Sequence, residues 1–350
     1  MSGDERVAVM LKKLSLSYGY VFYRLPGFEE YSLYAENRPF IGLEDVPTFN
    51  AGGKLMALRP DVTISVVKNA RAFSGTQKLF YDEKVVRKLP AGNLAEIGQM
   101  GVEVLGEVDA ATEAEVLELM LKTLGTVSDS YVLDISHVGV VEKILDYARL
   151  TAEDRGTVKA LLESKNAHDF KKFVNERKLD KVAAEAILTL INAPAERAAA
   201  FSELEKIDRR LGVFEELAAM KALAEYGGDR VNINFSIGGD GDYYNGLVFK
   251  GYIEGVPRAV LSGGRYDRLA EKFGRDCKAV GFALYLGELT RYFPDPLRSP
   301  DVVVVYSGNS GICATQLAKS LRKEGKTVLL SKTGPQNFSG EVVFAEADND

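Results

Sequence analysis

The feature that most constrains the fold is a long helix-forming stretch between two strand-forming regions. Residues 138–225 are rich in Ala, Glu, Lys and Leu and are almost wholly helical in pattern. Segments on both sides, such as 78–86 and 231–237, are apolar and typical of strands. We therefore expect an α+β domain made from 1–137 and 226–293, with 138–225 as a helical insertion.

A proline-rich linker separates a short tail from this domain. Three prolines lie between 294 and 300, and prolines in such density mark a loop. Beyond them, 302–306 and 327–330 read as strands on either side of a helix at 312–323. This order is typical of a βαβ unit. We therefore expect residues 301–350 to form a small C-terminal α/β unit.

Composition excludes several functional classes. The net charge is -6, whereas a protein whose main task is to grip nucleic acid usually has a basic excess. There is no apolar run long enough to span a bilayer, and the first residues lack the pattern of a signal peptide. We expect a cytoplasmic protein that contacts neither membrane nor tRNA.

The residues that usually bind metals are few. The two cysteines, Cys277 and Cys313, form no CxxC pair, and the two histidines, His137 and His168, lie far apart in the sequence. Surface or structural roles explain such histidines better than a metal site does. The sequence therefore predicts neither a metal nor a cofactor.

Five segments share a family pattern in the same order along the chain. They are 19–31, 58–63 (Leu-Arg-Pro-Asp-Val-Thr), 80–106, 239–246 (Gly-Asp-Gly-Asp-Tyr-Tyr-Asn-Gly), and 263–267 with Gly281-Phe282-Ala283. Together they resemble the motifs of class II histidyl-tRNA synthetases over about residues 5–293. The resemblance implies an antiparallel sheet flanked by helices, and a dimer that forms through the first segment.

The resemblance also implies a pocket for free histidine. Side chains alternate along a strand, so Gln99, Gly101 and Glu103 share one face, and Gly101 is expected to leave room for a ligand. The family pattern gives Asp61 the ammonium group and Glu103 the imidazole. Taken one at a time, these residues are better explained as an ordinary polar strand face and ordinary aromatics, but taken together they favour a ligand site. The predicted histidine-binding residues are Asp61, Thr63, Arg87, Gln99, Glu103, Tyr243 and Tyr244.

The family arginine of the segment 80–106 has two possible positions in this sequence. An ungapped alignment places it at Val85, and a two-residue deletion in the following loop places it at Arg87. We prefer Arg87, because Val85-Val86-Arg87 keeps an apolar-apolar-arginine pattern.

Several cations that the family uses to form an adenylate are missing. Charge that develops on the α-phosphate of ATP must be met by pre-placed cations. The family arginines fall on Gly239 and Glu288, and two loop arginines fall on Asn93 and Ala95. The short tail is also about half the size of an anticodon domain. We therefore expect no catalytic residues and no tRNA charging.

The resemblance extends to the synthetase-like regulatory subunits of short-form ATP phosphoribosyltransferase. These keep the histidine pocket, lose the ATP arginines and lack a full anticodon domain, as this sequence does. They imply a homodimer that joins a separate catalytic subunit and makes histidine biosynthesis sensitive to free histidine. Two alternatives remain at this point: a divergent histidyl-tRNA synthetase, or a paralogue that binds an amino acid in another assembly.

Overall fold

A computed structural model describes residues 3–37, 46–70, 75–88, 93–238, 243–292, 300–307, 310–335 and 340–345. They form two compact units, Met1–Pro294 and Asp295–Asp350. We describe each unit separately.

The first unit is built on a sheet of eight strands. In spatial order these are β1 (Val21–Phe22), β5 (Gln77–Lys88), β6 (Leu94–Gly106), β11 (Lys278–Tyr285), β10 (Leu261–Arg265), β9 (Leu247–Ile253), β7 (Tyr131–His137) and β8 (Val231–Ile233). The six central strands pair antiparallel, whereas β1 and β8 each pair parallel with their neighbour. The α+β class predicted from the sequence is confirmed, with a mixed sheet in place of a wholly antiparallel one.

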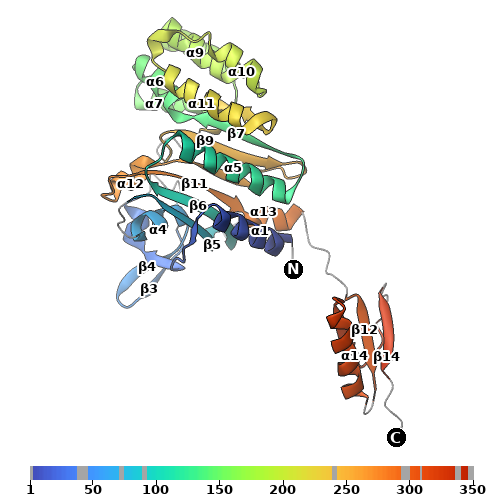
Figure 1. Ribbon diagram of the computed structural model, residues 1–350. Helices are drawn as coiled ribbons and strands as arrows, with labels where there is room; N and C mark the ends of the chain where they lie inside the picture. Colours follow the sequence, from blue (N-terminus) through green and yellow to red (C-terminus); the bar gives the residue numbers. More distant parts are fainter. Residues whose placement is uncertain are drawn as a thin grey trace. The chain divides into compact units, whose positions relative to one another are not determined.

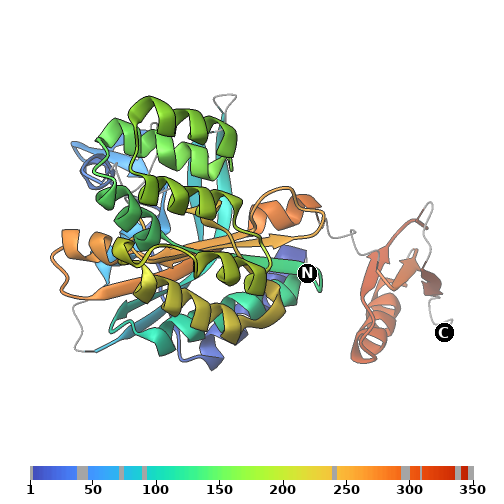
Figure 2. The same ribbon diagram turned by 90° about the horizontal axis from the view of Figure 1, so that it is seen from above.

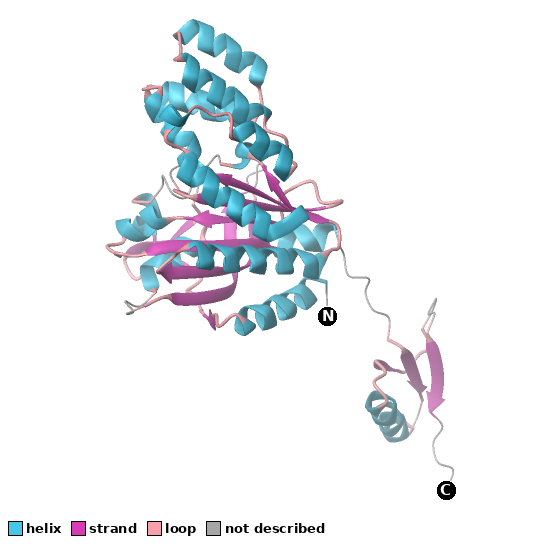
Figure 3. Ribbon diagram, turned by 45° about the horizontal axis from the view of Figure 1, so that its top comes forward, coloured by secondary structure: helices cyan, strands magenta, loops and turns pink. Residues whose placement is uncertain are grey.

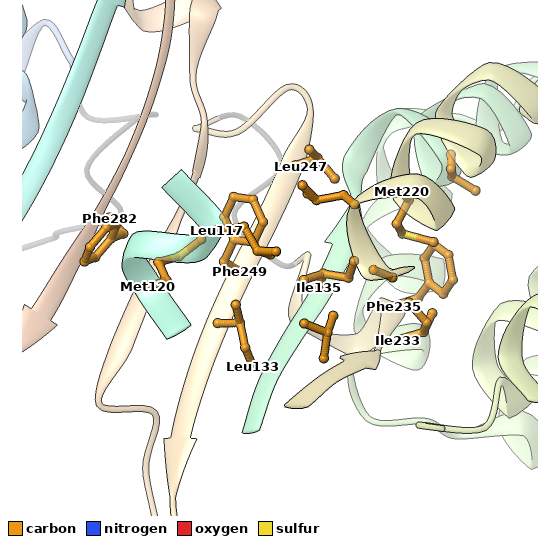
Figure 4. Packing of buried hydrophobic residues seen from close by; sticks show 14 of the residues in the cluster. Leu117, Met120, Leu133, Ile135, Met220, Ile233, Phe235, Leu247, Phe249 and Phe282 are labelled. Atoms are coloured by element: carbon orange, nitrogen blue, oxygen red, sulfur yellow. The ribbon is translucent and has the colours of Figure 1, made fainter. Parts of the chain in front are cut away.

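One face of this sheet packs against helices. α5 (Ala110–Val127) lies across it beside α1 (Gly3–Ser17), as Figure 1 shows. Asp109 starts α5 because its carboxylate accepts a hydrogen bond from the Thr112 backbone N–H at 2.9 Å. Leu117 and Met120 of α5 point toward the sheet residues Phe249 and Phe282 (Figure 4). This face carries the main apolar core, and on the opposite face a second apolar cluster includes Leu79, Val85 and residues of α4 (Val62–Asn69).

Residues 138–225 are helical, as predicted. They form α6 (Val138–Tyr147), α7 (Ala152–Glu163), α8 (Ala167–Arg177), α9 (Lys181–Asn192), α10 (Arg197–Leu204) and most of α11 (Phe214–Gly227). Figure 2 views the molecule from the side of these helices. Their buried residues belong to the same apolar cluster as the core of the sheet. Their assignment as a separate domain stays a prediction.

Residues that precede β5 in the sequence form a second, smaller sheet. It consists of β2 (Phe28–Glu30), β4 (Lys54–Leu58) and β3 (Thr48–Ala51), and α2 (Tyr31–Ala35) and α4 (Val62–Asn69) follow two of its strands. Phe28–Glu30 pairs with β4, and α2 begins directly after this strand at Tyr31.

The strand expected over 231–237 is too long. It ends at Ile233, and a 3₁₀ turn follows at Phe235–Ile237. The Asn234 side chain causes the change, because its Oδ1 accepts hydrogen bonds from both the backbone N–H and the hydroxyl of Ser236. Asn is well suited to such local capping, which competes with strand pairing.

The second unit has one strand more than predicted. β12 (Val302–Tyr306) lies between β13 (Val328–Ser331) and β14 (Glu341–Ala345), all parallel, and α14 (Gly311–Lys323) packs beside them (Figure 3). We had predicted the β12–α14–β13 part and had missed β14.

The described residues contain no helix that is both long and apolar enough to cross a membrane. Over the same ranges, no three His, Cys, Asp or Glu side chains come together as a metal site would require. His137 has a structural role, because its Nδ1 accepts a hydrogen bond from the Gly139 N–H at the start of α6. Burial lowers the pKa of His137 to about 4.

Candidate ligand-binding site

The face of the large sheet opposite α5 carries a cavity of about 170 Å³. Strand pairing places Glu103 opposite Gly281, and Gly101 opposite Ala283. The floor is therefore made of small residues between longer side chains. The cavity is lined by Asp61, Val62, Thr63, Tyr81, Arg87, Gln99, Glu103, Tyr243, Tyr244, Ser262, Gly263, Tyr266, Gly281, Phe282, Ala283 and Tyr285. All seven predicted histidine-binding residues are in this set, although their role as ligands stays a prediction.

Glu103 is the most deeply buried acidic side chain of the cavity, with 1% of its surface exposed. Its Oε1 accepts a hydrogen bond from the Thr63 hydroxyl at 2.7 Å, and its Oε2 accepts one from the Tyr266 hydroxyl. Burial raises the pKa of Glu103 to about 8, against the opposing effect of both hydrogen bonds. Glu103 is therefore largely a neutral acid at pH 7, and its hydrogen-bonding groups have a fixed direction.

Asp61 joins the cavity to the start of α4. Its Oδ1 caps the helix by accepting a hydrogen bond from the Ile64 N–H at 2.9 Å. Burial raises the pKa of Asp61, opposed by the Ile64 N–H and by the charge of Arg87. The other end of α4 is tied to the small sheet, because Lys68 Nζ and Asn69 Nδ2 each lie 2.7 Å from the Glu29 carboxylate.

Arg87 is the cation of the lining. It lies near the end of β5, opposite Ala95 on β6. Its Nε is buried and has no hydrogen-bond partner within the described part of the chain. An unpaired buried guanidinium nitrogen is costly, so a bound anion would satisfy it. Of the two positions considered for the family arginine of the segment 80–106, Arg87 lines the cavity and Val85 does not.

Aromatic hydroxyls dominate the remaining wall. The Tyr243 ring meets Tyr244 edge to face at 4.7 Å between centroids and lies 6.0 Å from Tyr266. Burial raises the pKa of these three tyrosines well above the usual value, so their hydroxyls stay protonated. They can therefore both donate and accept hydrogen bonds.

Sequence reasoning missed four polar lining residues: Tyr81, Ser262, Tyr266 and Tyr285. Alternation along a single strand does not reveal them. Tyr81 pairs with Gly101, and Tyr285 pairs with Gln99, so the register between strands places each on the face of the predicted residues.

The reason given for Gly101 is wrong. A Cβ at this position would lie 2.4 Å from the Tyr81 hydroxyl oxygen and 2.3 Å from the Phe282 carbonyl oxygen. The space above Gly101 is thus occupied by protein rather than kept for a ligand. Gly281 has the corresponding role for Glu103, whose Oε2 would lie 1.9 Å from an added Cβ.

The positions of the missing arginines are only partly described. Gly239 lies outside the described residues. Glu288 is on α13 (Leu286–Tyr292), with its Oε1 3.8 Å from Arg258 Nη1. Asn93 directly precedes β6 and is exposed, and Ala95 lies on that strand.

Comparison with known proteins gives one family and a consistent set of relatives. The sequence model of the family described as histidyl-tRNA synthetase matches residues 4–289. An ATP phosphoribosyltransferase regulatory subunit from Bacillus cereus (strain B4264) is 28% identical over 97% of this chain and 85% of its own length. One from Oceanobacillus iheyensis is 29% identical over 91% of this chain and 82% of its own.

Solved structures share the fold. An ATP phosphoribosyltransferase regulatory subunit/histidyl-tRNA synthetase from Bacillus halodurans has a TM-score of 0.82 at 24% identity and covers 98% of this chain and 94% of its own. A chain of the ATP phosphoribosyl transferase (HisG:HisZ) complex from Thermotoga maritima has a TM-score of 0.64 at 20% identity, covering 81% and 97%. At these identities the likeness concerns the fold alone.

Proposed function

Because this chain belongs to the histidyl-tRNA synthetase family, we propose that it is a regulatory subunit of ATP phosphoribosyltransferase that senses free histidine. The observation that carries the proposal is the cavity, which gathers Asp61, Arg87 and Glu103. Shortly after the lining residue Tyr285 in the sequence, Glu288 replaces a phosphate-binding arginine of the family pattern. The relatives with this regulatory name match nearly the whole chain, which supports the same reading.

The charges of the cavity suit a free amino acid. Asp61 is complementary to an ammonium group, and Arg87 to a carboxylate. Arg87 pairs with Ala95 near the start of β6, whereas Glu103 lies near the other end of that strand. Glu103 is complementary to a ring N–H. Histidine has all three groups. Gln99 and Thr63 would add neutral hydrogen bonds, and Tyr243 and Tyr244 would close the site.

In this proposal the chain has lost the ability to form an adenylate. A carboxylate at Glu288 repels a triphosphate where an arginine would attract it. Gly239, Asn93 and Ala95 replace three further arginines of the family pattern. Histidine would then bind without being activated, and its only effect would be on the conformation or assembly of a partner.

Mixing this chain with a short-form ATP phosphoribosyltransferase catalytic chain tests the function. We expect the rate of phosphoribosyl-ATP formation to rise on mixing and to fall again with histidine, by a factor of roughly 5–150. An unchanged rate in the mixture would eliminate the regulatory role. As a control, this chain alone with histidine, ATP and labelled pyrophosphate should give no exchange, since turnover there would indicate a working synthetase.

We also propose that the chain is a homodimer through the first family segment. Val21 on β1 is 63% exposed and Phe28 on β2 is 51% exposed. Phe28 and Phe49 of the small sheet meet edge to face at 5.7 Å, which leaves an apolar surface. A two-fold contact would bury the same surface on both copies.

Sedimentation at micromolar concentration should therefore give a dimer. Phe28→Glu should weaken dimerisation by at least about tenfold, because it places a charge in an apolar interface. Ile312→Glu is the matched control, since Ile312 is 75% exposed and lies on α14 of the second unit. A monomeric wild type, or equal effects of both substitutions, would contradict this interface.

A further inference from the structure

Tyr285 lines the cavity at the end of a strand. It is the last residue of β11 and pairs with Gln99, whereas Gly281 pairs with Glu103 earlier on β11. Four residues of strand separate the two pairs, a span of about 13 Å at roughly 3.3 Å per residue. Gly281, Ala283 and Tyr285 point to the same face. The cavity floor thus runs over a glycine and an alanine and then meets a phenol ring.

The Tyr285 ring is fixed from two sides. Its hydroxyl lies 3.1 Å from Ser262 Oγ on the neighbouring strand β10. Its backbone N–H donates to the Val260 carbonyl at 2.7 Å. Ser262 and Tyr244 both line the cavity beside Tyr285. A side chain held at both its backbone and its tip does not swing aside at low cost.

The volume of the cavity fits this boundary. At about 170 Å³ it is smaller than the roughly 300–1,000 Å³ of sites that enclose larger organic ligands. With an amino acid's ring at Glu103, its carboxylate lies toward Arg87 and the Gln99–Tyr285 pair. A nucleotide joined to that carboxylate would have to extend past Tyr285.

We propose that Tyr285, held by Ser262, ends the cavity and restricts it to a free amino acid, so that a nucleotide or an aminoacyl-adenylate is excluded by shape. The inference rests on the proposed function, in which this cavity binds histidine. Nucleotides would then be excluded for two reasons, because the family arginines are missing and because Tyr285 occupies the space. The steric barrier would remain if the arginines were restored.

Calorimetry with two probes tests the barrier: free histidine, and a non-hydrolysable histidyl-sulfamoyl analogue of the adenylate. The wild type should bind histidine and bind the analogue at least about tenfold more weakly. Tyr285→Gly should bind the analogue at least about tenfold more tightly than the wild type does. Tyr285→Phe is the matched control, because it keeps the ring, and it should still exclude the analogue.

The outcomes separate this inference from the proposed function. Histidine binding by the wild type reports on the function, and the analogue reports on the barrier. A wild type that binds the analogue as tightly as histidine would overturn the inference, as would a folded Tyr285→Gly protein that still excludes it. If thermal unfolding shows that Tyr285→Gly is not folded, Tyr285→Ala gives the same comparison, and the wild-type measurement stands independently.

Discussion

Replacing Glu103 with glutamine should make the unliganded protein more stable and weaken its binding of histidine. The wild-type carboxyl has a pKa of about 8 in the folded chain and an ordinary value of 4.5. The folded state therefore holds a proton that the unfolded state has lost between these two values, so stability falls as the pH rises through this window. At about 1.4 kcal/mol per pKa unit, the cost above pH 8 is about 3–5 kcal/mol.

Glutamine has nearly the same shape and carries no charge, so it removes this cost. The variant and the wild type should be equally stable near pH 4.5, and the variant should gain up to the full difference by pH 8. Above pH 8, where the wild-type carboxyl is ionised, loss of this charged partner should weaken histidine binding at least about tenfold, since a charge-assisted hydrogen bond contributes about 1.5–3 kcal/mol.

Urea unfolding between pH 4.5 and 9, with calorimetry for histidine, measures both effects. Glu83→Gln is the opposite control, because Glu83 accepts from Arg59 Nη2 at 2.6 Å and its neutralisation leaves a buried cation unpaired. Glu83→Gln should destabilise the protein at pH 8. A Glu103→Gln protein with wild-type stability across this pH range would show that burial does not keep Glu103 neutral.

Gly281→Ala should close the cavity from below. The new methyl group would lie 1.9 Å from Glu103 Oε2 and 2.4 Å from the Val102 carbonyl oxygen, so a backbone shift is unavoidable. Such overpacking typically costs about 1–3 kcal/mol. Because Glu103 is displaced from the hydroxyls of Thr63 and Tyr266, histidine binding should become undetectable.

Gly287→Ala is the matched control for this change. Gly287 is on α13, and an added Cβ would meet only Ile97 Cγ2, at 3.9 Å. Alanine is favoured over glycine in a helix by up to about 1 kcal/mol, so stability should hold or rise and histidine binding should persist. If Gly281→Ala keeps full histidine affinity, the ligand lies elsewhere on the protein.

Features set by local interactions could be predicted from the sequence, whereas contacts between distant segments could not. Alternation along β6 placed Gln99 and Glu103 on one face, because side-chain direction in a strand is a local property. The contact between Tyr285 and Ser262 depends on the register between two strands, and no single segment contains it. Gly101 was misjudged for the same reason, since its close neighbour Tyr81 belongs to another strand.

Element boundaries failed where a side chain competed with the backbone. The pattern at 231–237 alternates well enough for a strand, but the carbonyl oxygen of the Asn234 side chain satisfies Ser236 locally and ends the pairing. β14 was missed because Glu341–Ala345 is short, and its place beside β12 depends on a partner almost forty residues earlier.

α4 connects the cavity to the small sheet as one rigid element. Eight residues of helix form a rod about 12 Å long at 1.5 Å per residue. At its first end, next to the cavity, the helix is capped by the Asp61 carboxylate. At its other end, Lys68 and Asn69 donate hydrogen bonds to the carboxylate of Glu29 on the small sheet. If a bound ligand moves Asp61, the helix would move with it as a rigid unit and would displace Glu29 on β2. In the proposed dimer, such a displacement would reach the interface on the small sheet without bending the eight-stranded sheet.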